Sequence, residues 1–189
     1  MNKINEKRVF IAIPICAVIK PVLPLLKFTF TRNYENIKGI PLENIHLTLK
    51  FAGNISIHYI PILIQSLKKY IIQSSFKLVI ESTGVFSSSH SPKVLWLGIK
   101  RNDKELKIMC AQINKSLKVI IENSPKKIFT PHITIGKVLN NFVKIDVLPF
   151  LNTVYSPIEL SVNSICLYES KLSPEGAKYI ILNEFPLNR

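Results

Sequence analysis

The sequence predicts an α+β fold built from antiparallel sheets. Three observations support this class: strand-like and helix-like segments are mixed, they do not follow the strict strand–helix–strand order of a parallel sheet, and one strand pattern occurs twice about half a chain apart. The 189 residues fit a single domain, or one domain made of two similar lobes, and the repeated pattern favours a single two-lobed domain spanning 1–189. A hydrophobic content of 47% supports a sizeable core and argues against a disordered chain.

The apolar run near the N-terminus predicts the first strand, at residues 7–14. Basic residues followed by an apolar run also resemble a signal peptide, but this run contains Pro14 and has no small-x-small cleavage site. It is also far shorter than the roughly 20 apolar residues that cross a bilayer. We therefore expect a cytoplasmic protein with no membrane-spanning segment.

The rest of the first half predicts one strand and one helix. Residues 15–32 are ambiguous, because Pro21 and Pro24 interrupt any helix there. A strand follows at 44–53. The segment 58–73 places its apolar residues on one helical stripe, which predicts a helix that packs on the core.

The second half repeats this mixture of strands and helices. Short runs rich in β-branched and aromatic residues predict strands, and a 3.6-residue apolar period predicts helices. Trp96 lies within one of these runs and is interpreted as a core aromatic residue. In chain order we expect strands at 76–86 and 93–100 joined by the polar loop Ser87–Pro92, a helix at 102–123, a strand at 131–138, a short helix at 141–151, and closing strands at 157–169 and 177–184.

The chain is strongly basic, with 25 Lys and Arg residues against 12 Asp and Glu residues and a formal net charge of +13. This excess favours an anionic partner such as a nucleic acid, although a lysine-rich solvated surface would give the same composition. The cysteines Cys16, Cys110 and Cys166 are odd in number and have no C-x-x-C spacing, which is typical of a reducing compartment. No recognisable metal-ligand cluster accompanies them, and we expect neither a metal nor another cofactor.

The repeated strand pattern carries the functional prediction. It reads "NIHLTLKFAG" at 44–53 and "FTPHITIGKV" at 129–138, so that His-x-Thr stands between apolar residues in both. Side chains at i and i+2 of a strand share one face. His46 therefore projects with Thr48, and His132 with Thr134, while the aliphatic neighbours face the core. If each lobe contributes one such strand, the two pairs lie across a cleft.

Two such pairs suit acid–base chemistry on a phosphoryl group. Imidazoles with a pKa near 6.5 can divide the roles of proton acceptor and proton donor at neutral pH. Threonine hydroxyls can donate hydrogen bonds to non-bridging phosphoryl oxygens. This chemistry needs no metal and no covalent nucleophile, and the residues alone do not decide which histidine has which role.

Several segments resemble the two-histidine phosphoesterases, and within them the RNA 2',3'-cyclic phosphodiesterase family, also called 2'-5' RNA ligase-like. The matching segments are "RVFIAIP", "PLENIHLTLKFAGNI", "VLWLGIK", "FTPHITIGKV" and "LYESKLSPEGAKY". The resemblance implies two lobes around a central cleft, each an antiparallel sheet backed by helices. It also implies that His46 donates a proton, that His132 accepts one, and that Thr48 and Thr134 bind phosphate.

The resemblance further implies that the substrate is RNA with a 2',3'-cyclic phosphate end and the product a 2'-phosphomonoester. Many family members have Arg where Lys137 stands here; lysine keeps the charge but loses bidentate phosphate recognition, and we count Lys137 among the substrate-binding residues. A monomer is expected. Two alternatives stay open: a phosphodiesterase or ligase for small cyclic nucleotides or 2'-5' linkages, and a non-catalytic RNA-binding module.

Overall fold

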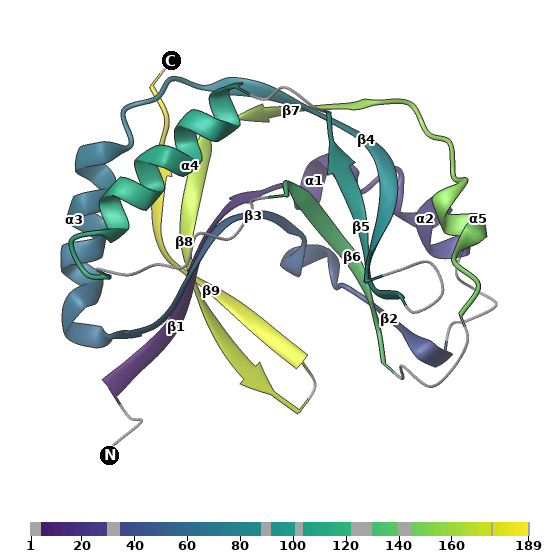
Figure 1. Ribbon diagram of the computed structural model, residues 1–189, viewed down its shortest axis with the longest axis horizontal. Coiled ribbons are helices and arrows are strands. Elements are labelled where there is room, and N and C mark those ends of the chain that lie inside the picture. Colours follow the sequence, from purple (N-terminus) through teal and green to yellow (C-terminus); the bar gives the residue numbers. More distant parts are fainter. Residues whose placement is uncertain are drawn as a thin grey trace.

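The computed structural model describes residues 5–29, 35–87, 92–100, 104–121, 130–139, 145–174 and 176–188. Strands and helices are mixed along the chain as the sequence predicts (Figure 1). The strands are β1 (Glu6–Pro14), β2 (Ile37–Gly39), β3 (His46–Ser56), β4 (Phe76–Ser87), β5 (Pro92–Ile99), β6 (His132–Val138), β7 (Ile158–Val162), β8 (Ser164–Ser173) and β9 (Gly176–Pro186). The helices are α1 (Cys16–Ile19), α2 (Leu23–Phe28), α3 (Ile60–Tyr70), α4 (Lys104–Leu117) and α5 (Leu148–Leu151), with 3-10 turns η3 (Leu42–Asn44) and η4 (Ile57–Tyr59).

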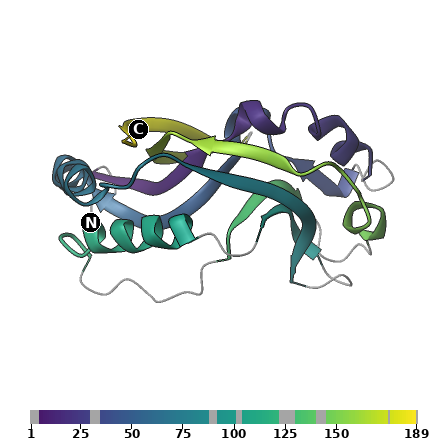
Figure 2. The same cartoon turned by 90° about the horizontal axis from the view of Figure 1, so that it is seen from above.

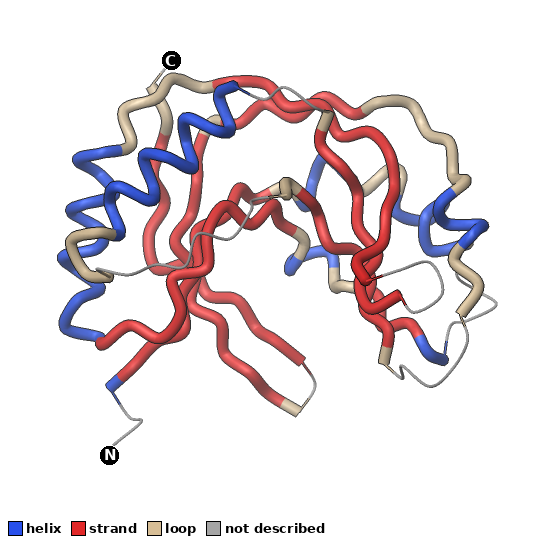
Figure 3. Tube along the Cα trace, viewed as in Figure 1, coloured by secondary structure: helices blue, strands red, loops and turns tan. Residues whose placement is uncertain are grey.

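Within the described residues, nine strands form one sheet that curls strongly (Figure 3). The strand order is β7-β4-β5-β6-β3-β1-β8-β9, with β2 added to β6, and the pairs between these named strands are antiparallel. The sheet therefore has two halves that meet where β3 pairs with β6. We call β3-β1-β8-β9 the His46 half, and β7-β4-β5-β6 with β2 the His132 half. The predicted antiparallel α+β class with two similar lobes is confirmed.

Helices back both halves of the sheet. Figure 2 shows α3 and α4 at one end of the molecule and α2 and α5 at the other. Helix α4 contacts β3 and helix α3 contacts β9, whereas α5 contacts β4. The long helices bury one stripe each, as their sequence period predicts: Ile60, Leu63 and Leu67 in α3, and Leu106, Met109, Ile113 and Leu117 in α4. None of the described helices is long and apolar enough to span a membrane.

One predicted element differs from the structure, and the structure adds detail in two places where no element was predicted. The predicted strand 157–169 is two strands with a break at Asn163: β7 pairs with β4 in the His132 half, and β8 pairs with β1 in the His46 half. The ambiguous stretch 15–32 contains the short helices α1 and α2. Pro24 lies in the first turn of α2, where a backbone N–H has no acceptor within the helix, so the missing N–H of proline breaks no hydrogen bond. Strand β2 was not predicted, since three residues carry no readable period.

The remaining elements agree with the predicted order within a few residues at their ends. Helix α5 is shorter than the predicted helix 141–151, and the part of that prediction at 141–144 lies outside the described residues. The same holds for 88–91 in the predicted polar loop and for 102–103 and 122–123 at the ends of the predicted long helix.

Candidate active site

Both His-x-Thr motifs lie at the junction of the two halves, on β3 and β6. The alternation predicted from the sequence is confirmed. The aliphatic residues Leu47, Leu49, Ile133 and Ile135 are buried on the helix-covered face. His46, Thr48, His132 and Thr134 are half-buried on the opposite face. The aliphatic side chains thus hold the strands in place from behind, as a rigid support for four polar side chains.

The pairing of β3 with β6 brings the two motifs next to each other. Leu47 lies directly opposite Ile133 in the antiparallel β3–β6 pair. Because the two strands are antiparallel, the positions next to this pair run in opposite directions. The register therefore places His46 across from Thr134, and Thr48 across from His132. Each histidine of one motif is therefore near the threonine of the other, on one continuous face of the sheet.

Each histidine is oriented by the backbone two residues before it. His46 Nδ1 lies 2.7 Å from the carbonyl oxygen of Asn44, and His132 Nδ1 lies 2.7 Å from that of Thr130. A carbonyl oxygen only accepts, so Nδ1 carries the proton and donates it in both rings. This leaves Nε2 of each ring available for proton transfer, in the same tautomer on both sides.

Aromatic side chains surround His46. Its ring centroid lies 4.9 Å from that of Phe10, 5.1 Å from that of Tyr179 and 6.2 Å from that of Tyr168. Tyr179 meets the imidazole edge-on at 87°, and Tyr168 stacks on Phe10 at 12°. These rings restrict the imidazole on several sides and exclude water from it.

His132 has a different set of neighbours. Phe86 on β4 meets its ring edge-on, with centroids 4.6 Å apart at 86°. The position across the strand pair is Gly98. Trp96, opposite Thr134, lies against Phe86 with centroids 5.4 Å apart and covers Gly84, where an added Cβ would lie 2.2 Å from the indole.

Trp96 was predicted to be a core residue, and its placement differs from that prediction. It is half-buried on the same face as Thr134, where its ring forms part of the floor around His132. Its indole nitrogen is buried and has no hydrogen-bond partner among the described residues. The flat ring fits there because the strand next to it carries glycine.

The electrostatics of the pair centre on His46. Burial lowers the pKa of this histidine below its ordinary 6.5, and the nearby charges of His132 and Lys137 lower it further. The hydrogen bond to the Asn44 carbonyl acts in the opposite direction, because it stabilises the protonated ring. His46 is thus more readily neutral than a free imidazole while no anion is bound.

A β-bulge brings Lys137 to the site. By simple alternation Lys137 would share the core-facing side of Ile133 and Ile135. Gly136 pairs with Leu95 while Thr134 pairs with Trp96, so β6 has one extra residue at this point. The bulge turns the next side chain back to the face of His132 and Thr134, which explains how Lys137 influences His46.

Beside the motifs lies a cavity of about 550 Å³ between η3–β2 and the β8–β9 hairpin. Lys38, Asn44, Lys137, Lys178 and Tyr179 are among the residues that line it. Two of these residues, Asn44 and Tyr179, are also neighbours of His46. Among the described residues, no group of three or more His, Cys, Asp or Glu could hold a metal ion.

Sequence reasoning missed the aromatic neighbours Phe10, Phe86 and Tyr179, as well as Asn44. The aromatic residues come from distant segments, and nothing in their local pattern distinguishes them from core residues. Asn44 had a readable signal, because Asn44 and Thr130 stand two residues before the two histidines at equal offset. A carbonyl at that offset can reach the imidazole of a strand that begins there.

Comparisons with known proteins agree with this architecture. The family model described as the 2'-5' RNA ligase superfamily matches residues 29–173. A Thermotoga maritima protein named RNA 2',3'-cyclic phosphodiesterase is 29% identical over 178 residues, covering 94% of this chain and 94% of that protein. An Aquifex aeolicus protein of the same name is 32% identical over 160 residues, covering 79% of this chain and 81% of that protein.

Solved structures share the fold. A Thermus thermophilus protein matches with a TM-score of 0.78 at 20% identity, covering 95% of this chain and 97% of that one. Escherichia coli LigT complexed with 3'-AMP matches with a TM-score of 0.77 at 20% identity, covering 97% of this chain and 99% of that one. With a family model that spans most of its length, the chain belongs to the 2'-5' RNA ligase superfamily.

Proposed function

We propose that this protein hydrolyses the 2',3'-cyclic phosphodiester at the end of an RNA chain and releases a 2'-phosphomonoester. One observation carries the proposal: His46 and His132 lie on one face of the sheet, each with Nδ1 donating to a carbonyl and Nε2 available. The names of the relatives, RNA 2',3'-cyclic phosphodiesterase, support the choice of substrate.

In the proposed reaction the two histidines have complementary roles. His132 Nε2 takes a proton from water as the water oxygen forms a bond to phosphorus. The bond between phosphorus and O3' breaks, and His46 Nε2 donates its proton to that oxygen. One water is consumed, and the 3'-hydroxyl and the 2'-phosphate are the products. This assignment of donor and acceptor follows the family resemblance.

Thr48 and Thr134 would stabilise the charge that develops on the phosphoryl oxygens. Both residues are half-buried on the face of the histidines. In the proposed mechanism each hydroxyl donates a hydrogen bond to a non-bridging oxygen. Lys137 would add positive charge at the edge of the same face, to which the bulge in β6 turns it.

The lowered pKa of His46 fits this reaction once the substrate is included. A general acid must be protonated, and burial disfavours the imidazolium in the free protein. A phosphodiester anion bound between the rings replaces the lost solvation and favours the imidazolium. We propose that substrate binding itself charges His46, so that the acid forms where it is needed.

The proposed mechanism uses no metal. Support comes from the two histidines, which backbone carbonyl oxygens orient so that Nε2 of each ring is available for proton transfer. We also propose a monomer in the cytoplasm, since one chain supplies all four motif residues and both described cysteines, Cys110 and Cys166, are free thiols.

The test is end-group analysis of an RNA oligomer with a 2',3'-cyclic phosphate after incubation with the protein in EDTA. We expect a 2'-phosphate end and undiminished turnover in the chelator. A 3'-phosphate end would contradict the assignment of the broken bond. Loss of activity in EDTA that one divalent ion restores would contradict the metal-free mechanism. Binding of the RNA without hydrolysis would instead support the alternative of a non-catalytic RNA-binding module.

A further inference from the structure

The end of the β8–β9 hairpin lies beyond the rest of the sheet. Strand β8 pairs with β1 through Cys166–Glu169, and past Glu169 its partner among the described strands is β9 alone. Figure 1 shows this end of the hairpin projecting from the sheet. It buries little apolar surface, since Leu172 is 72% exposed. A two-stranded ribbon of this kind is only marginally stable by itself, so contacts from outside the ribbon have to fix its position.

Tyr179 belongs to this ribbon and is one of the rings around His46. Its ring centroid lies 5.1 Å from that of His46 and 5.0 Å from that of Phe10, and both contacts are edge-on. Phe10 is on β1, which is held on both sides by β3 and β8. Tyr179 instead pairs with Ser170 of the ribbon. The contact between Tyr179 and His46 therefore depends on where the ribbon lies.

Asn44 ties the ribbon to the chain just before His46. Its side-chain amide donates to the carbonyl oxygen of Ala177 over 2.9 Å, two residues before Tyr179. Its own carbonyl oxygen lies 2.7 Å from His46 Nδ1 and accepts the proton of that nitrogen. One residue thus contacts the imidazole directly and also anchors the strand that carries a second contact of the same ring.

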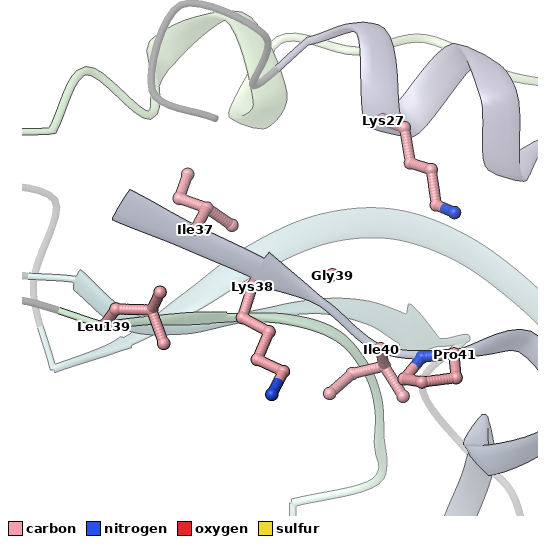
Figure 4. A pocket seen from close by; sticks show the side chains of 7 residues that line it. All are labelled: Lys27, Ile37, Lys38, Gly39, Ile40, Pro41 and Leu139. Carbon is pink, nitrogen blue, oxygen red and sulfur yellow. The ribbon is translucent and has the colours of Figure 1, made fainter. Parts of the chain in front are cut away.

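The segment from β2 to η3, which leads to Asn44, has little packing of its own. Turn η3 contains no buried residue, and it borders the cavity of about 550 Å³. A second cavity, of about 390 Å³, is lined by Ile40 and Pro41 among others, and Figure 4 shows these two residues at the end of β2. The hydrogen bond to Ala177 is therefore a fixed point for η3 as well as for the ribbon.

We propose that Asn44 is a positioning residue for His46. Its carbonyl holds the imidazole at Nδ1, and its side chain keeps Tyr179 against the same ring, so that Nε2 stays directed at the phosphoryl group. The inference rests on the proposed function, because it takes His46 as a group that transfers a proton. Asn44 acts through His46 and needs no contact with the substrate.

The first measurement follows two edge-on ring contacts within one protein. Nuclear Overhauser effects report the contact between the Tyr179 and His46 rings, and that between the Phe86 and His132 rings, whose centroids lie 4.6 Å apart. In Asn44→Ala, checked for fold by circular dichroism, we expect the first contact to weaken and the second to keep its intensity. A role in overall stability would instead weaken both contacts or neither.

The second measurement is kcat and KM on a cyclic-phosphate oligonucleotide. Asn44→Ala and Tyr179→Leu should each lower kcat by about 10- to 100-fold with little change in KM, because a small misplacement of a catalytic group slows the chemical step. The double variant should be scarcely slower than the slower single variant, since both changes release the same ring.

Asn183→Ala is the matched control for the loss of a side-chain amide. Asn183 is also on β9, but its amide donates to the Glu184 carbonyl oxygen over 2.8 Å, within the strand itself. Its replacement removes a hydrogen bond of the same kind without releasing the ribbon from η3. We expect wild-type kcat and both ring contacts in this variant.

Other outcomes would overturn the inference. An unchanged contact between Tyr179 and His46 in Asn44→Ala would show that the amide does not hold the ribbon. Equal weakening of both ring contacts would make Asn44 a general support of the fold. A normal kcat in a folded Asn44→Ala protein would exclude a role in positioning the acid.

Two further results separate this inference from folding and from the proposed function. If Asn44→Ala does not fold, Tyr179→Leu keeps Asn44 and removes the ring, and a normal kcat in that variant would overturn the inference. If the wild-type protein hydrolyses no cyclic phosphate, the proposed function fails by itself. The ring contacts in Asn44→Ala then still test whether Asn44 holds Tyr179 against His46.

Discussion

The two His-x-Thr strands of this protein have the same local plan but different surroundings. Both histidines donate from Nδ1 to a carbonyl two residues earlier, and both meet an aromatic ring edge-on. Both strands also contain a bulge just after the threonine. In β3, Thr48 pairs with Ala12 and Lys50 with Ile11, so one residue is skipped as it is in β6. The repeat thus includes a distortion of the backbone as well as a sequence pattern.

The consequence of the bulges differs between the two halves. At equal offset after the histidine, the bulge turns Lys137 to the site in the His132 half and Phe51 in the His46 half. Phe51 is 63% exposed and lies near Phe10, with ring centroids 5.8 Å apart. One half therefore offers a cation and the other an aromatic surface. The same backbone feature thus gives the two halves different side chains at equivalent positions.

The strongest test of this comparison is removal of each histidine. His46→Ala and His132→Ala should each lower kcat by about 10²–10⁴-fold, since each histidine supplies one proton transfer in the proposed mechanism. The double variant should be scarcely slower than either single variant, because the two groups act in one step. Single-turnover rates on a cyclic-phosphate oligonucleotide measure all three. Near-normal kcat in either single variant would contradict the paired roles.

The threonines test whether the two halves stabilise the phosphoryl group equally. Thr48→Val and Thr134→Val keep the shape of the side chain and remove a donor. Each should lower kcat by about 10²–10³-fold with little change in KM, if the hydroxyls act mainly in the transition state. Steady-state kinetics separates the two parameters. A rise in KM at constant kcat would instead make the hydroxyls ground-state contacts.

The pH dependence tests which half supplies the acid. His46 must be protonated to donate, and its pKa in the free protein lies below 6.5, mainly because the ring is buried. The protonated fraction falls as pH rises through that pKa, so kcat/KM should fall on its alkaline side. The alkaline limb of kcat should lie at higher pH, because the bound phosphodiester anion favours the imidazolium.

The measurement is a pair of pH profiles, for kcat/KM and for kcat, with the same cyclic-phosphate substrate. The His46→Ala variant serves as the control, since its residual activity should lack the alkaline limb. A kcat/KM that rises to a plateau as pH increases through 6.5 would reverse the assignment and make His46 the base.

The smallest expected effect concerns packing beside His132. Gly98 faces that histidine across the strand pair, and an added Cβ would lie 2.4 Å from Ser82 Oγ and 3.1 Å from the Glu81 carbonyl oxygen. Gly98→Ala should therefore lower the free energy of unfolding by about 1–3 kcal/mol. At Gly39 the nearest atom to an added Cβ is 4.0 Å away, and Gly39→Ala should stay within about 0.5 kcal/mol of wild type.

Urea denaturation of both variants measures the difference. Equal stability of the two would show that the β4–β5 pair relaxes around the methyl group, and that the close packing at Gly98 is not needed to hold Trp96 and the His132 strand in place.

The local sequence pattern was sufficient to predict which side chains of several strands and helices are buried. Strict alternation in both motifs put His46 and His132 on the face opposite the buried aliphatic residues, because side chains of a strand point alternately to its two sides. The 3.6-residue period of α3 and α4 likewise predicted their buried stripes. These features depend only on the geometry of one segment, and for that reason one segment suffices to predict them.

Tertiary structure decided the rest. The pairing of β3 with β6, the division of 157–169 between the two halves, and the aromatic rings around His46 all depend on segments that are distant in the chain. A bulge is defined by two residues of one strand opposing one residue of its partner, so it has no meaning until the partner is known. Alternation alone directs Lys137 toward the core, and its pairing with β5 and β2 turns it to the site.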